Sequence, residues 1–151
     1  MKTLVFVLIL ISTTIFSVAR EKKSDEAQIK ETILNYIEGF YEANPDRMSK
    51  ALHPELAKRS IWQGPEGNSF IKPATKSLIV HVTRMQKNNK APEMNPDQKF
   101  KAKIKIFDIE QNSASAKVST NKLNFFDYIH LVKYNGEWKI LNVLWEPYKK
   151  K

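Results

Sequence analysis

The chain has 151 residues, a net charge of +9 and no cysteine. A chain of this length forms one domain whose core is large enough to fold without disulfides. It contains only four glycines and three scattered histidines, too few for a glycine-rich phosphate loop or a histidine metal site, so no cofactor and no metal is expected. The basic residues are mostly lysine. Nucleic acid is therefore not expected as a partner, because arginine supplies the bidentate phosphate contacts.

The start of the chain predicts a secretory signal. Lys2 provides the positive charge, an uncharged apolar run follows, and the small residues Ser17 and Ala19 mark the expected cleavage site. The uncharged run is shorter than the roughly 20 apolar residues that span a bilayer. We predict a signal peptide over residues 1–19, a domain over residues 20–151, and a secreted or periplasmic protein with no membrane contact beyond export.

Helical periodicity follows the leader. Ser24 is a suitable N-cap, and apolar residues then recur at the spacing of one helix face. These residues are Ile29, Ile33, Tyr36, Ile37 and Phe40. A second, short helix is expected to start at Asn44 and to end at His53, because Pro54 disfavours helical geometry in the residue before it.

The middle of the chain predicts a strand, a loop and a third helix. Residues 57–63 can form the first strand, and the glycines and Pro65 after it indicate a loop. The third helix is expected to open at Pro73 and to run through Met85, although its branched residues also suit a strand. Residues 87–98 are polar and predict an exposed loop.

Alternating lysines and apolar residues predict the next strand, with one basic face. The lysines are Lys99, Lys101, Lys103 and Lys105. A solvated face that discourages edge pairing explains them more simply than an anion site. After a turn at residues 111–113, the small residues Ala114, Ala116 and Val118 predict a strand that leaves space inside the fold.

The strongest signal is a hairpin at Asn135-Gly136, since this pair favours a two-residue type I′ turn between β-prone runs. Regular pairing from this turn places Asp127 and Asn142 on one face. With them it places Phe125, Ile129, Leu131, Trp138, Ile140 and Leu144. The other face receives Phe126, Tyr128, His130, Val132, Leu141, Val143 and Trp145.

Both faces of the hairpin are too apolar to be left in water. We expect helices to cover the face of Asp127 and a second copy of the chain to cover the other, which predicts a homodimer. On this register Val143 lies in the dimer contact, so Val143→Lys is expected to yield a monomer.

Two parts of the sequence resemble one known family. The hairpin patterns at Asp127–Leu131 and Trp138–Glu146, and the stretch ALHPELAKR at Ala51–Arg59, resemble the putative lumazine-binding family of the nuclear transport factor 2-like (SnoaL-like) superfamily. The resemblance implies an α+β cone in which a curved antiparallel sheet packs on about three N-terminal helices. That superfamily includes isomerases, dehydratases, transport factors and ligand binders, so the fold does not select a function.

Six side chains are candidates for a ligand-binding site. They are Tyr41, His53, Trp62, Asp127, Trp138 and Asn142. The aromatic residues could equally be core or pocket wall, the histidine could cap a helix end, and the amide could be structural. Asp127 in an apolar cavity could be a base with a raised pKa, or a strand-end carboxylate bonded to nearby hydroxyl or backbone groups.

Three functions remain open at this point. We expect an exported, non-catalytic domain that binds a small, partly aromatic molecule, and the family resemblance suggests a pteridine-like or flavin-like ring. The alternative is an isomerase or dehydratase in which Asp127 is the general base and a tyrosine or Asn142 steadies the oxyanion. A third is a protein-interaction module that uses the outer aromatic face of the hairpin.

Overall fold

The computed structural model describes residues 23–148, which form three helices and a six-stranded sheet. The helices are α1 (Asp25–Tyr41), α2 (Pro45–Ala51) and α3 (Lys76–Met85). The strands are β1 (Leu52–Gln63), β2 (Ser69–Ala74), β3 (Ala102–Glu110), β4 (Ser113–Thr120), β5 (Phe125–Tyr134) and β6 (Glu137–Pro147). The predicted signal peptide, residues 1–19, lies outside the described residues. No helix among the described residues is long and apolar enough to cross a membrane.

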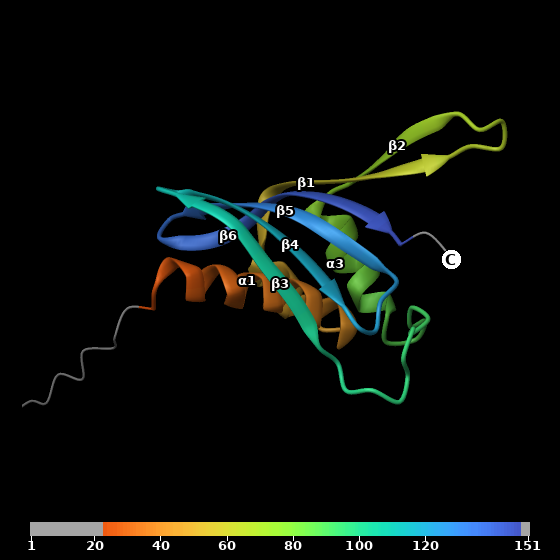
Figure 1. The fold of residues 1–151 in the computed structure, drawn as a ribbon, viewed down its shortest axis with the longest axis horizontal. Coiled ribbons are helices and arrows are strands. Elements are labelled where there is room, and N and C mark those ends of the chain that lie inside the picture. The colour runs from red at the N-terminus through yellow and green to blue at the C-terminus, as the bar shows by residue number, and fades with distance from the viewer. Residues whose placement is uncertain (1–22, 149–151) are drawn as a thin grey trace, which may run out of the picture.

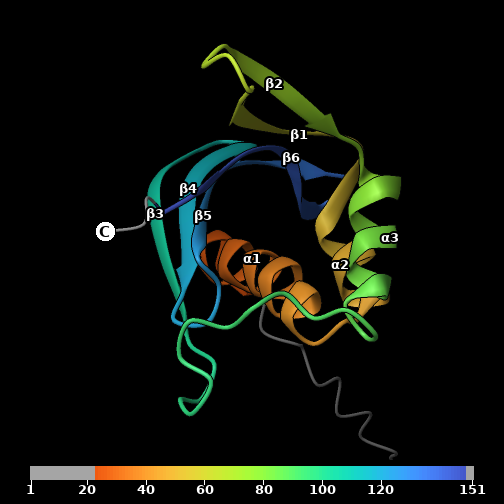
Figure 2. The ribbon, with the colours of Figure 1, turned by 90° about the vertical axis from the view of Figure 1, so that its right-hand side faces the viewer.

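The sheet has the order β2-β1-β6-β5-β4-β3, and only its β1–β6 pair is parallel within the described chain. It curves around α1, while α2 and α3 lie beside β1 (Figures 1 and 2). The predicted α+β class is therefore confirmed. We call the face of the sheet that packs on α1 the inner face and the opposite one the outer face.

Helix α1 covers the inner face with the apolar side that the periodicity predicted. Ile29 and Ile33 are fully buried and join a core that includes Ile129 and Ile140 of the sheet. Burying a side chain of this size stabilises the fold by about 1.5–3 kcal/mol. The cap is also as predicted, because the hydroxyl group of Ser24 accepts a hydrogen bond from the amide of Ala27 at 3.2 Å.

Helix α2 ends at Ala51, two residues before the predicted end, and β1 begins at once. His53 and Pro54 therefore lie in the strand. The pairing of β1 with β6 is irregular between Leu52 and Ala57. A proline is tolerated there because an irregular stretch of strand does not need its missing amide donor.

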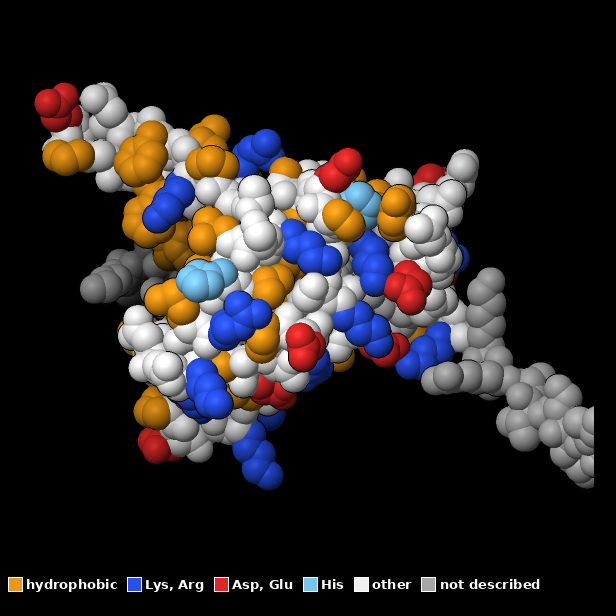
Figure 3. Space-filling view, turned by 180° about the vertical axis from the view of Figure 1, so that it is seen from behind, with side chains coloured by type: hydrophobic (Ala, Val, Ile, Leu, Met, Phe, Trp, Pro, Cys, Tyr) orange, Lys and Arg blue, Asp and Glu red, His pale blue; other side chains and the backbone are white. Residues whose placement is uncertain are grey.

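The predicted start of the third helix at Pro73 is wrong. Pro73 lies in β2, an edge strand that the sequence did not predict, and Thr75 caps α3 instead. An edge strand accepts proline because one side of its backbone has no ladder partner. Strands β1 and β2 form an arm that projects beyond the rest of the sheet (Figure 1). Seen from behind, the arm carries several hydrophobic side chains (Figure 3).

The hairpin turn forms as predicted. Asn135 and Gly136 have φ values of 51° and 80°, both in the left-handed region that a type I′ turn requires. Tyr134 pairs with Glu137, and the pairing follows the predicted register as far as Leu131.

The register then shifts, because β6 contains one extra residue. Leu131 pairs with Ile140, but the next residue, His130, pairs with Asn142, which leaves Leu141 as a bulge. A bulge moves every later side chain of its strand to the opposite face. Asp127 consequently pairs with Trp145 rather than with Leu144.

Because of the bulge, four residues of β6 lie on the opposite face from the one predicted. Val143 is only 3% exposed and belongs to the core, whereas Leu144 is 44% exposed on the outer face. Trp145 turns to the inner face, beside Asp127. Asn142 turns to the outer face, beside His130, so its predicted place next to Asp127 is wrong.

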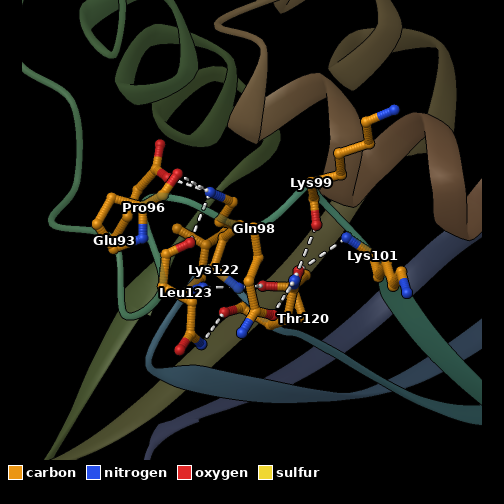
Figure 4. A network of polar contacts seen from close by, with 10 residues as sticks. Glu93, Pro96, Gln98, Lys99, Lys101, Thr120, Lys122 and Leu123 are labelled. Atoms are coloured by element: carbon orange, nitrogen blue, oxygen red, sulfur yellow. Dashed lines mark hydrogen bonds and ion pairs between the residues drawn. The ribbon is translucent and has the colours of Figure 1, made fainter.

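A buried lysine in the turn between β4 and β5 helps to hold the predicted loop over residues 87–98. The side chain of Lys122 is 2% exposed, and its ammonium group donates to the carbonyl oxygens of Asn95 at 2.7 Å and Pro96 at 2.8 Å. It also forms an ion pair with Glu93 at 2.8 Å (Figure 4). Three acceptors match the three donors of an ammonium group, which compensates the burial of its charge.

Candidate ligand-binding site

Three polar side chains meet on the inner face of the sheet. The ammonium group of Lys58 donates to the Tyr36 hydroxyl oxygen at 2.6 Å and to Oδ1 of Asp127 at 3.0 Å. The Tyr36 hydroxyl group in turn donates to Oδ2 of Asp127 at 3.1 Å. We call these three residues the polar triangle. Each carboxylate oxygen in it has a donor.

Each member of the polar triangle comes from a different element. Tyr36 lies on the apolar side of α1, seven residues after Ile29, and helical geometry places both on the same side. Lys58 of β1 pairs with the buried Val143 and therefore points inward. Asp127 comes from β5. The triangle thus joins α1 to two strands that are not neighbours in the sheet.

The carboxyl group of Asp127 is sealed from solvent, with 0% of the residue exposed. Burial raises its pKa above the ordinary value, and the charge of Lys58, together with the hydrogen bonds from Lys58 and Tyr36, offsets part of this rise. Burial and the adjacent carboxylate also raise the pKa of Tyr36 well above its usual value. The phenol therefore stays protonated and remains a donor.

Lys58 is the member of the polar triangle that reaches solvent, since its side chain is 14% exposed. Its ammonium group also lies 6.0 Å from the ring centre of Phe125, within the range of a cation–π contact. The triangle uses two of its three donors. The third can therefore serve an acceptor on a ligand.

A row of aromatic rings extends outward from Lys58 along the inner face. The ring centre of Phe125 lies 5.7 Å from that of Trp145, which lies 6.1 Å from that of Trp62. Phe125 and Trp145 are half-buried, whereas Trp62 is 42% exposed. We call Phe125, Trp145 and Trp62 the aromatic wall. Rings at such separations favour stacking, so the wall suits a planar ligand.

Neighbouring groups hold the outer end of the aromatic wall in place. The indole nitrogen of Trp62 donates to the hydroxyl group of Ser60 at 2.8 Å. The ammonium group of Lys72, on β2, lies 5.1 Å from the Trp62 ring centre. At the inner end, Phe40 of α1 contacts Phe125 edge to face, with ring centres 6.3 Å apart.

Of the six predicted site residues, only Asp127 and Trp62 belong to the polar triangle and the aromatic wall. Trp138 is a buried core residue at the other end of the cone, where its indole nitrogen donates to Asp25 at 3.1 Å. Tyr41 stacks on Phe100, with ring centres 4.5 Å apart.

His53 and Asn142 also lie elsewhere. The ring nitrogen Nδ1 of His53 accepts from the amide of Glu55 at 3.1 Å, and its ring contacts Tyr134 edge to face. Both contacts lie at the irregular start of β1. Asn142 lines a hollow on the outer face.

Lys58 was not among the predicted site residues, and the regular register had placed Trp145 on the wrong face. The alternation of β1 contained a usable signal, because Lys58 and Trp62 are four residues apart and strand side chains with even spacing share a face. The position of Trp145 depends on the bulge in β6, which no local pattern of the sequence indicates. No group of three or more His, Asp or Glu side chains within residues 23–148 is arranged to hold a metal ion.

Comparison with known proteins relates this chain to a family. The chain matches the family model described as putative lumazine-binding over residues 24–146. A nuclear transport factor 2-like protein of unknown function from Shewanella baltica is 20% identical, with a TM-score of 0.61, and the match covers 85% of this chain and 100% of that one. No curated protein matches the chain.

Two further solved structures share the fold. A ketosteroid isomerase-like protein from Erwinia carotovora atroseptica is 10% identical, with a TM-score of 0.57, and the match covers 85% of this chain and 100% of that one. A putative scytalone dehydratase from Novosphingobium aromaticivorans is 10% identical, with a TM-score of 0.55 and coverage of 82% and 84%. These similarities confirm the predicted nuclear transport factor 2-like fold, and at such identities they show the fold alone.

Proposed function

The chain belongs to the putative lumazine-binding family, and we propose that it binds a small planar molecule against the aromatic wall without catalysing a reaction. The observation that carries this proposal is the continuity of the wall with Lys58. A ring stacked on Phe125 or Trp145 would direct an edge toward the ammonium group. The ligand class is therefore a heteroaromatic ring with a carbonyl or anionic oxygen at its edge, which a pteridine such as lumazine, or a flavin fragment, satisfies.

The sealed carboxylate supports binding rather than catalysis. A general base must come within hydrogen-bond reach of the proton that it removes. Both oxygens of Asp127 already accept hydrogen bonds, and the residue has no exposed surface. Of the two predicted oxyanion partners, Asn142 lies on the opposite face. The tyrosine beside Asp127, Tyr36, is itself buried and donates its hydroxyl group to the carboxylate. An isomerase or dehydratase reaction based on Asp127 is therefore the weaker alternative.

Titration of the purified protein with lumazine, followed by calorimetry, tests the proposed site. Trp62→Leu removes the most exposed ring of the aromatic wall and is expected to weaken binding about three- to tenfold, the equivalent of one stacking contact. Tyr134→Leu is the matched control, because Tyr134 is a similarly exposed ring that lies outside the aromatic wall and lines neither hollow of the outer face. Equal losses in both variants, or no binding to the native protein, would contradict the proposal.

We also propose that the part of the outer face over β1, β5 and β6 contacts a second copy of the chain. A hollow of about 490 Å³ lies there over β1, β5 and β6. Leu144 and Tyr128 border it, and both are exposed large side chains. Exposed apolar patches of this kind often mark contacts between subunits. A protein-interaction module, the third function that the sequence left open, would use this same surface.

Export is the third part of the proposal, and it rests on residues 1–19 of the sequence. The intact mass of protein recovered from the medium or the periplasm is expected to correspond to a chain that starts near Arg20. Recovery of the full-length chain from the membrane fraction would contradict it.

A further inference from the structure

The outer face carries a second hollow, of about 340 Å³, over β3, β4 and β5. Its lining includes the lysines Lys103, Lys105 and Lys117 and the rings of Phe107, Tyr128 and Tyr148. Of the four lysines in the predicted row, only Lys103 and Lys105 fall within β3, which begins at Ala102. Lys117 comes from β4, so the sheet assembles a cluster that the row alone did not show.

The lysines of this hollow are close together without a compensating carboxylate. Lys105 and Lys117 are direct cross-strand partners, an arrangement of like charges that disfavours pairing. None of the ion pairs among the described residues includes Lys103, Lys105 or Lys117. The nearest carboxylate along the strand, Asp108, is in register with Ser115 and does not line the hollow. A bound anion would relieve this repulsion.

The same hollow presents flat aromatic surface. The rings of Phe107 and Tyr128 have centres 6.1 Å apart and planes 26° apart, and both side chains are exposed. The ammonium group of Lys105 lies 5.2 Å from the Phe107 ring centre. That of Lys117 lies 5.1 Å from the Tyr128 ring centre. Ring surface and positive charge are therefore adjacent.

We propose that this hollow binds a small aromatic phosphate of the size of a nucleoside monophosphate. The phosphate group would lie between Lys105 and Lys117, since ammonium groups form strong charge-assisted hydrogen bonds with phosphate oxygens. The base would stack on the exposed ring of Phe107, which does not border the hollow of the proposed dimer contact. The volume lies at the lower end of the range of small-molecule sites, which suits a mononucleotide.

This site is independent of the aromatic wall, because it lies on the other face of the sheet. It also differs from the proposed dimer contact, which lies over β1, β5 and β6 and shares only Tyr128 with it. Two copies meeting through β3 and β4 would bring their lysine clusters together, an arrangement that like-charge repulsion disfavours. A dimer through Leu144 would leave the lysines available.

Calorimetry of the full chain with AMP, adenosine and inorganic phosphate tests the proposal. AMP is expected to bind more tightly than either of its parts. The double variant Lys105→Gln/Lys117→Gln is expected to weaken AMP binding about tenfold or more, as the loss of charge-assisted contacts implies. Phe107→Leu is expected to weaken AMP binding and to leave inorganic phosphate binding unchanged.

Lys87→Gln/Lys99→Gln is the matched control, because it removes the same charge from exposed positions outside the hollow. Its AMP affinity is expected to stay within about twofold of the native value. Equal weakening by the two double variants would overturn the proposal in favour of general electrostatic attraction. AMP affinity equal to that of inorganic phosphate, or no AMP binding, would also overturn it, as would a loss caused by Trp62→Leu on the inner face.

Discussion

The hydroxyl group of Tyr36 donates to the carboxylate of Asp127 across 91 residues of sequence and thereby joins α1 to β5. Both residues are buried, so water does not compete for this bond. The same carboxylate binds Lys58, the group that faces the aromatic wall. The Tyr36–Asp127 hydrogen bond therefore joins α1 to the sheet and also helps to position Lys58. We propose that the ammonium group of Lys58 contacts the ligand.

Tyr36→Phe is expected to lower the free energy of unfolding by about 1–3 kcal/mol, because it leaves one oxygen of a fully buried carboxylate without its donor. Urea denaturation followed by circular dichroism measures this loss. Tyr134→Phe is the control, since it removes the hydroxyl group of an exposed tyrosine and is expected to change stability by less than about 0.5 kcal/mol. Similar effects of the two substitutions would contradict the structural role of the Tyr36 hydroxyl group.

Lys58→Met is expected to destabilise the fold by about 3–5 kcal/mol near neutral pH, the usual consequence of removing one partner of a buried ion pair. The loss is expected to depend on pH. Lys58 lowers the pKa of Asp127, which burial already raises above its ordinary value. Without the lysine, the pKa of Asp127 in the folded state rises further.

The direction of this pH dependence follows from proton binding. An aspartate in the unfolded chain has a pKa of about 3.9, and a higher folded pKa means that the folded state binds the proton more tightly. Stability then falls as the pH rises from the unfolded to the folded pKa. The loss caused by Lys58→Met should therefore be smaller near pH 4 than near pH 7.

The double variant Lys58→Met/Asp127→Asn is the control for this pH effect. This variant has no carboxyl group at position 127 that could titrate. The additional loss of stability that Lys58→Met shows between acidic and neutral pH should therefore be absent from it. Urea denaturation across this range compares the variants. A loss for Lys58→Met that is constant with pH would contradict the account of the polar triangle.

Val143→Lys and Leu144→Lys test the bulge at Leu141. Val143 is buried, so a lysine there is expected to destabilise the fold by more than about 3 kcal/mol. Leu144 is exposed on the outer face, so the same substitution is expected to preserve the fold and to convert the proposed dimer to a monomer. Thermal denaturation and light scattering measure the two effects. A folded, monomeric Val143→Lys variant would instead favour the regular register.

The sequence predicted the elements whose signals are local. The Asn135-Gly136 turn, the capped first helix and the family patterns of the hairpin all lie within short segments, where turn chemistry and periodicity decide the structure. The edge strand β2 was missed because Gly64, Pro65 and Gly67 suggested a loop, and Pro73 suggested a helix start.

The candidate site was only partly predictable, because it depends on pairing between distant segments. Asp127 and Trp62 were both identified, but Asn142 and Trp145 exchanged faces through a single extra residue in β6. A bulge is set by how the two strands fit the curved sheet, and the alternation of one strand does not contain that information. Lys58 reaches the site through the parallel β1–β6 pair, in which Lys58 pairs with Val143, 85 residues later in the chain.

Lys122→Met tests how the loop after α3 is held. The variant keeps an unbranched side chain of similar reach and removes the ammonium group that binds Asn95, Pro96 and Glu93. The loss of charge-assisted bonds is expected to lower stability by about 1–3 kcal/mol and to speed amide hydrogen exchange over residues 93–98. Lys87→Met, at an exposed position of the same segment, is the control and should leave exchange nearly unchanged. If both variants exchange alike, the buried ammonium group does not hold the loop.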